Sequence, residues 1–325
     1  MTSQEPLFLR SFIIDKKGRG QIIDTEEVRQ WSPEQGMLWV HLDVSDPHAN
    51  RWLLKEAKLP AIAIDTLLAG ETRPRSLVSD EGMLAVLRGV NMNPGADPED
   101  MVSIRIWIDE HRIISSRRRR LLSIDDISES LHAGNGPNSP GDFLVILIER
   151  LADRIGGFVD SIEDRMDDAE DEISGGRAPG FRQRLSALRR QIAEVRRFLA
   201  PQRDALDRLT RQSNKWVSDS EAHNLRQEAD RITRFLEDLD LARERAVVLQ
   251  EELLSLIAQE QNARMYVLSV VAAIFLPLTF ITGLLGMNVG GLPGLENSAG
   301  FTWSIVVMLV AGAGLWLFFR WKKWL

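Results

Sequence analysis

The sequence has 325 residues, of which 27% are charged and 44% are hydrophobic, and its formal net charge is −7. This composition excludes a disordered chain, and the negative charge gives no reason to expect nucleic acid as a partner. The sequence contains no cysteine, which excludes a disulfide-stapled fold and any thiolate metal site.

Residues 1–142 predict an α/β domain. Short runs rich in β-branched and aromatic residues alternate with helical stretches such as DPHANRWLLKEA, residues 46–57. The expected strands have the sequences LFLRSFII, MLWVHLDV, MLAVLRGV, VSIRIWID and RIISS. The first ten residues lack a basic start followed by an apolar run, so we expect no signal peptide. The segment 132–142, dense in Gly, Pro, Asn and Ser, leads out of this domain.

From residue 143 to residue 264 the periodicity is helical and predicts a long-helix stalk. Two apolar stripes with three- and four-residue steps flank the turn SGGRAPG, and they predict a helical hairpin interrupted near Pro201. The stripes consist of Leu144, Leu147, Leu151, Ile155, Phe158, Ile162 and Met166, and of Phe181, Leu185, Leu188, Ile192, Val195 and Leu199.

A third stripe in the stalk has a period near 3.5. No proline or glycine lies between Glu221 and Pro277, so one helix is expected to run from the cytosol directly into a membrane. A stripe of this period, entering a membrane, suggests that several copies of the chain are arranged around an axis. The stripe comprises Ile232, Phe235, Leu239, Ala242, Ala246, Leu249, Leu253, Leu256 and Glu260.

Residues 265–325 predict a transmembrane domain with two spans. Residues 265–285 and 301–319 carry no charge, and about 20 such residues in a helix cross a hydrocarbon layer of ~30 Å. Lys and Arg flank the spans but are absent from the loop 286–300, so both termini are expected on the cytoplasmic side. The whole chain is thus an α+β, multi-pass membrane protein.

One face of the first span carries the small and hydroxyl side chains. This face comprises Met265, Leu268, Ser269, Ala272, Leu276, Thr279, Gly283 and Gly286. The opposite face, with Val267, Ile274, Leu278 and Ile281, is purely apolar. Small and hydroxyl residues in a span serve either to line a pore or to pack helices, and the spacing leaves both open.

The sequence MYVLSVVAAIFLPLTFITGLLGMNVGGLPG (residues 265–294) resembles the CorA superfamily of divalent-cation transporters. Gly286, Met287 and Asn288 match its Gly-Met-Asn signature after a span containing Phe-x-Pro-x-Thr-Phe. The segments LLAGETRPR (67–75), APQRD (200–204) and VGGLPG (289–294) are similar to its bacterial zinc-transporting branch.

The resemblance implies a homopentamer in the bacterial inner membrane, with a cytoplasmic funnel and the first span lining a fivefold pore. Carried over by position, its pore residues are Asn262, Met265, Leu268, Leu276, Thr279 and Asn288. It implies proton-coupled uptake of Zn²⁺, with hydrated metal held at Asn288. The alternatives are zinc efflux, or a Mg²⁺, Co²⁺ or Ni²⁺ channel gated by cytoplasmic metal.

No catalytic motif or phosphate-binding glycine loop is present, so we expect neither an enzyme nor a bound cofactor. A two-span membrane sensor is the other class of protein considered. The run SSRRRRLL, residues 115–122, is interpreted as an exposed strand end, with contact to lipid or nucleotide as the alternative.

Overall fold

The computed structural model describes residues 7–70, 72–175, 180–211, 217–287 and 299–322. The chain divides into two compact units, Met1–Gln250 and Glu251–Leu325, and each is described by itself. The predicted boundaries at residues 142 and 264 follow sequence periodicity and stay predictions.

A seven-stranded mixed sheet forms the N-terminal part of the first unit. Its strand order is β2-β1-β3-β7-β6-β5-β4, and β3 and β7 are the parallel pair among otherwise antiparallel neighbours. The strands are β1 (Arg10–Ile14), β2 (Gly20–Ile22), β3 (Met37–Asp43), β4 (Arg75–Val78), β5 (Met83–Gly89), β6 (Val102–Ile108) and β7 (Arg112–Arg117). The five expected strands correspond to β1, β3, β5, β6 and β7.

Helices cover both faces of this sheet, which explains why β3 is buried along almost its whole length. On one face Val40 and Leu42 pack with Trp52 and Leu53 of a short helix. On the other face Trp39 meets the ring of Phe143 at 5.0 Å. The shorter helices are α1 (Thr25–Gln30), the 3₁₀ turn η1 (Pro33–Gln35), α2 (Pro47–Lys55), α3 (Ala61–Leu68) and α4 (Leu122–His132).

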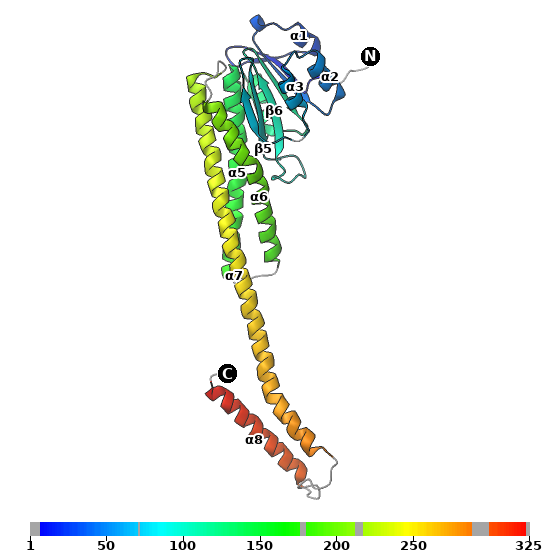
Figure 1. The fold of residues 1–325 in the computed structure, drawn as a ribbon, viewed down its shortest axis with the longest axis vertical. Coiled ribbons are helices and arrows are strands. Elements are labelled where there is room, and N and C mark those ends of the chain that lie inside the picture. Colours follow the sequence, from blue (N-terminus) through cyan, green and yellow to red (C-terminus); the bar gives the residue numbers. More distant parts are fainter. Residues whose placement is uncertain (1–6, 71, 176–179, 212–216, 288–298, 323–325) are drawn as a thin grey trace. The chain divides into compact units, whose positions relative to one another are not determined.

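Three long helices continue the first unit: α5 (Pro140–Ser174), α6 (Phe181–Arg211) and α7 (Asp219–Leu285) (Figure 1). Arg231 of α7 pairs with Asp153 of α5 at 2.8 Å, and Arg196 of α6 pairs with Asp240 of α7 at 2.7 Å. These ion pairs fix the three helices side by side around an apolar interior.

The predicted interruption of the hairpin near Pro201 is wrong, because α6 continues through the proline. A proline removes one backbone hydrogen bond from a helix interior. Here the buried residues Leu199, Ala205 and Leu206 hold the helix together on both sides of the proline. Gln202 also accepts a hydrogen bond from the backbone N–H of Arg88 at 2.6 Å.

Most of the third stripe is buried within its own chain, whereas Phe235 and Leu256 are half-buried and Glu260 is exposed. Ile232, Leu239, Ala242, Ala246 and Leu249 are each at most 3% exposed, in the part of α7 that lies against α5 and α6. Burial against α5 and α6 accounts for this part of the stripe, and the suggestion of several copies around an axis stays a prediction. The continuity of α7 from the first unit into the apolar segment is confirmed.

The second unit contains the end of α7 and the helix α8 (Gly300–Trp321). Both helices are long and apolar enough to span a membrane. They touch within the unit, since a Cβ placed on Gly312 would lie 4.0 Å from Leu278 Cδ1. The fold thus has a mixed sheet, three long helices and two apolar C-terminal helical segments, of which the first is the end of α7.

Gly156 and Gly157 of α5 offer a test of how α5 meets α7. A Cβ on Gly156 would lie 2.9 Å from the Phe235 ring, whereas one on Gly157 would meet nothing within 4 Å. Gly157→Ala should stabilise the protein by about 0.5–1 kcal/mol, because glycine weakens a helix interior. Gly156→Ala should destabilise it by roughly 1–2 kcal/mol through overpacking.

Thermal unfolding of the detergent-solubilised protein measures both changes. Adding Phe235→Leu to the Gly156→Ala variant should restore part of the loss, because the shorter side chain makes room for the new methyl group. Equal melting temperatures for the two alanine variants would contradict the close contact.

Candidate functional site

The candidate site is one face of the apolar half of α7. A single continuous helix carries all the site residues that the sequence predicted before the signature: Asn262, Met265, Leu268, Ser269, Ala272, Leu276, Thr279 and Gly283. From residue 265 onward they follow steps of three and four, which place them in one line along the helix. Ala272 is half-buried within the chain and the others are exposed. The stretch from residue 262 to residue 283 is about 32 Å long at 1.5 Å per residue, close to the thickness of a bilayer core.

The opposite face of α7 is the one that α8 covers. Ile274, Leu278 and Ile281 are half-buried, and α8 presents the small residue Gly312 at this contact. At 100° per residue these three side chains point away from the line through Ala272, Leu276 and Thr279. The second helix therefore takes the purely apolar face, and among the described residues it leaves the face with hydroxyl and small residues largely uncovered.

The threonine hydroxyls use their protons inside the helix. Thr279 Oγ1 donates to the carbonyl of Phe275 at 2.8 Å, and Thr282 Oγ1 donates to the carbonyl of Thr279 at 2.9 Å. A hydroxyl that donates in this way keeps its oxygen lone pairs as acceptors. The Thr279 hydroxyl therefore offers oxygen lone pairs, and no free proton, to a partner outside the helix.

Pro277 adds a further acceptor that sequence reasoning missed. Its nitrogen carries no hydrogen, so the carbonyl of Ala273, four residues earlier, loses the partner it would have in a regular helix. The proline inside a predicted span was the signal that could have revealed this oxygen.

The signature triplet begins where α7 ends. The N–H of Gly286 donates to the carbonyl of Thr282 at 2.9 Å and closes the last helical turn. A Cβ on Gly286 would lie only 3.0 Å from that same carbonyl oxygen, so glycine fits this close turn. Met287 follows as an exposed residue, and Asn288 lies outside the described residues.

Strong zinc ligands are absent from the spans that the structure describes. Residues 265–285 contain no His, Asp or Glu, and no three such side chains gather as a metal site among the described residues. The five histidines all precede the spans. His41 is fully buried with Nδ1 2.8 Å from Ser115 Oγ, and burial lowers its pKa to about 3. The arrangement can therefore offer an ion neutral oxygen atoms but no strongly bonding nitrogen or thiolate.

Comparisons with known proteins agree on one family. A family model described as CorA-like Mg²⁺ transporter protein matches residues 34–323. The divalent cation transporter CmaX of Pseudomonas aeruginosa is 39% identical over 320 residues, which are 97% of this chain and 96% of the relative. The zinc transport protein ZntB of Yersinia enterocolitica is 36% identical over 317 residues, or 97% and 95% of the two chains.

Solved structures show the same architecture. The structure of full-length CmaX matches with a TM-score of 0.86 at 37% identity, over 99% of this chain and all of the other. The complete CorA magnesium transporter of Methanocaldococcus jannaschii matches with a TM-score of 0.82, over 98% and 99% of the two chains. At 18% identity this second likeness concerns the fold alone.

Proposed function

Because this chain belongs to the CorA-like family and is a divalent-cation transporter of that family, we propose that it carries Zn²⁺ into the bacterial cell together with protons. The cation follows the line of exposed residues on α7, which faces a pore at the centre of a homopentamer. The zinc transport proteins among its relatives support the choice of zinc.

The observation that carries the pore is the acceptor-bearing face of α7. Stripping a unit charge into a medium of low dielectric costs of order 20 kcal/mol, and a divalent ion faces roughly four times as much because the cost scales with the square of the charge. An ion that keeps its water shell avoids most of this penalty. The outward hydrogens of that shell need acceptors, and Ser269 and Thr279 place oxygen on this face, as Asn288 would at the outer mouth.

What one chain leaves uncovered supports an assembly of several copies. A single α7 cannot enclose an ion, and α8 covers the face opposite the line of exposed residues. Copies arranged around an axis enclose that line and place the apolar residues of α7 and α8 against lipid. The fivefold number comes from the resemblance to the family.

The charge distribution supports an inner-membrane protein with both termini in the cytoplasm. Arg264 precedes the first span, and Arg320, Lys322 and Lys323 follow the second, whereas residues 286–300 contain no Lys or Arg. Of these, Arg320 lies over the ring of Trp316 at 5.2 Å in the last turns of α8, an arrangement typical of an interfacial anchor.

A second candidate is a Mg²⁺, Co²⁺ or Ni²⁺ channel gated by cytoplasmic metal. The observation in its favour is that the first span has no carboxylate or histidine to relay a proton. The family model also carries the name of a Mg²⁺ transporter. In this candidate a proton gradient has no effect on flux. Zinc efflux uses the same pore in the opposite direction.

Uptake of Zn²⁺, Mg²⁺, Co²⁺ and Ni²⁺ into proteoliposomes, with and without an inward proton gradient, tests the proposal. Zinc uptake should grow with the gradient and should be lost in Asn288→Ala, because the mutation removes the amide oxygen at the mouth. Asn297→Ala, in the same loop, is the matched control and should keep wild-type flux. Mg²⁺ flux that ignores the gradient would favour the channel.

Thr279→Val keeps the shape of the side chain and removes its oxygen. We expect Zn²⁺ uptake to fall roughly five- to tenfold, since one net hydrogen bond of about 1 kcal/mol corresponds to such a factor. Thr302→Val makes the same change in α8, outside the predicted line, and should leave the initial rate unchanged. Similar losses in both variants would argue for a general effect on the membrane domain.

Leu268 is a candidate for a hydrophobic constriction that closes the pore by dewetting. Leu268→Ser should raise the cation leak through reconstituted protein in the absence of a gradient. Val267→Ser introduces the same hydroxyl on the opposite face of α7 and should not change the leak. The gating role is refuted if conductance measurements give the same leak for Leu268→Ser and wild type.

A further inference from the structure

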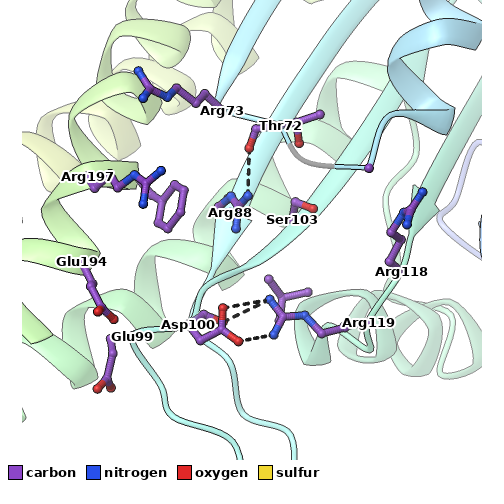
Figure 2. Close-up of a pocket in the computed structure, with 13 residues that line it drawn as sticks. Thr72, Arg73, Arg88, Glu99, Asp100, Ser103, Arg118, Arg119, Glu194 and Arg197 are labelled. Atoms are coloured by element: carbon purple, nitrogen blue, oxygen red, sulfur yellow. Dashed lines mark hydrogen bonds and ion pairs between the residues drawn. The ribbon is translucent and has the colours of Figure 1, made fainter.

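A cavity of about 700 Å³ lies in the first unit, between the sheet and α6 (Figure 2). Its walls come from segments far apart in the sequence: the loop before β4, strands β5 and β6, the residues after β7, and α6. The cavity is separate from the line of exposed residues on α7, and the proposed transport does not use it. Its size lies within the range of small-molecule sites, roughly 300–1,000 Å³.

Arginine dominates the cavity wall. Five arginines face three carboxylates there: Arg73, Arg88, Arg118, Arg119 and Arg197 against Glu99, Asp100 and Glu194. This excess of positive charge stands out in a protein whose net charge is −7. Folding has therefore concentrated like charges at one place, at an electrostatic cost that needs a reason.

Two of these arginines are held by the fold. Arg119 pairs with Asp100, and its guanidinium hydrogen bond lowers the pKa of that carboxyl. Arg88 donates to the carbonyls of Met101 at 2.6 Å and Thr72 at 2.9 Å, and it lies 4.0 Å from the centre of the Phe198 ring.

The other three arginines lack such hydrogen bonds, and Arg197 lies 5.6 Å from the centre of the Phe198 ring. Within the described part of the chain, Arg73, Arg118 and Arg197 make no hydrogen bond or ion pair. All three are exposed, so their guanidinium groups are accessible from solvent. They come from a loop, from the end of a strand and from a helix, and only the fold brings them to one cavity.

A buried arginine beneath the cavity is the second, independent observation. Arg105 of β6 is 0% exposed, and its Nη2 donates to the carbonyl of Gly70, a cavity residue, at 2.8 Å. Its Nε and Nη1 have no partner among the described residues, which exclude Glu71. Burial first, and then the charges of Arg118 and Arg88, lower the pKa of Arg105 to about 10.

Arg118 lies close to the same glycine, since a Cβ on Gly70 would be 3.6 Å from Arg118 Nη2. Gly70 therefore has the guanidinium of Arg118 near its Cα and that of Arg105 on its carbonyl. The hydroxyl of Thr72, another cavity residue, is buried and also has no partner among the described residues. Of these unpaired donors, the Thr72 hydroxyl belongs to the cavity wall and can donate to a bound anion, while the buried charge of Arg105 adds to the positive potential next to the cavity.

We propose that this cavity binds a soluble, multiply charged phosphate-type anion, held by Arg73, Arg118 and Arg197. The planar guanidinium group offers paired N–H donors that match two phosphate oxygens at once. A doubly or more highly charged anion suits three unpaired guanidinium groups better than a single carboxylate does. The site gives a function to Arg118 in the arginine run at residues 117–120.

Binding of inorganic pyrophosphate to the purified full-length protein in detergent tests this proposal, by isothermal titration at constant ionic strength. We expect saturable binding with a dissociation constant below about 1 mM. The double substitution Arg73→Gln with Arg118→Gln should weaken binding at least tenfold. Arg226→Gln with Arg243→Gln removes two exposed arginines of α7 and should leave the affinity unchanged.

Thermal melting gives a second readout that does not depend on transport. Without ligand, the cavity double variant should melt no lower than wild type, because Arg73 and Arg118 make no hydrogen bond or ion pair among the described residues and Arg118 repels Arg105. Pyrophosphate should raise the melting temperature of wild type and of the control variant, but not that of the cavity variant.

Three outcomes would overturn the proposal. The first is no saturable binding, and the second is an equal loss of affinity in the cavity and control variants, which would mean general attraction between charges. The third is tighter binding of dihexanoyl phosphatidic acid than of pyrophosphate, which would assign the cavity to a lipid headgroup. Loss of ion uptake in Asn288→Ala with unchanged pyrophosphate binding separates this site from the pore.

Discussion

The helix α7 must keep its backbone groups hydrogen-bonded both in water and in hydrocarbon. Hydrocarbon forms no hydrogen bonds, so a backbone group that lacks a partner there gains none from the solvent. Its first part satisfies this condition as any soluble helix does and buries one stripe against α5 and α6. Its last part is apolar on most sides, and its threonine hydroxyls donate back to the helix. The backbone bond missing at Pro277 is the exception, and it leaves an oxygen exposed to a partner from outside the helix.

Sequence periodicity predicted the strands and helices that bury a continuous face, and it failed where burial is shallow. The strands β2 and β4 were missed, and both are short edge strands of three and four residues, in which Ser76 is the one buried residue. Edge strands are commonly short and polar, which removes the alternating pattern that identifies a strand. The helix through Pro201 was missed for a related reason, since contacts with the sheet hold it and local propensity opposes it.

The candidate site, too, could be predicted from the sequence only in part. The spacing of Leu268, Ala272, Leu276 and Thr279 was enough to predict a common face, because a helix fixes that geometry locally. The sequence could not show which face of α7 the second span covers, since this depends on a contact such as that of Gly312 with Leu278. The arginine cavity was beyond prediction, because Arg73, Arg118 and Arg197 meet only after β7 is placed beside β6 and α6 is laid on the sheet.

Neutral oxygens along α7 also constrain where ion preference can arise. Zinc differs from magnesium chiefly in its affinity for imidazole and thiolate, and the described part of the first span has neither. The soft donors are the thioethers of Met265 on the predicted pore line and of Met287 in the signature, which carry no charge and bind zinc weakly. Hydroxyl and amide oxygens interact with the water shell, and hydrated divalent ions present similar shells to them. A preference for zinc must therefore arise where water is removed from the ion, or where the protein couples the pore to a second ion. The proton coupling proposed above is of this second kind, and it requires no dedicated zinc ligand in the membrane.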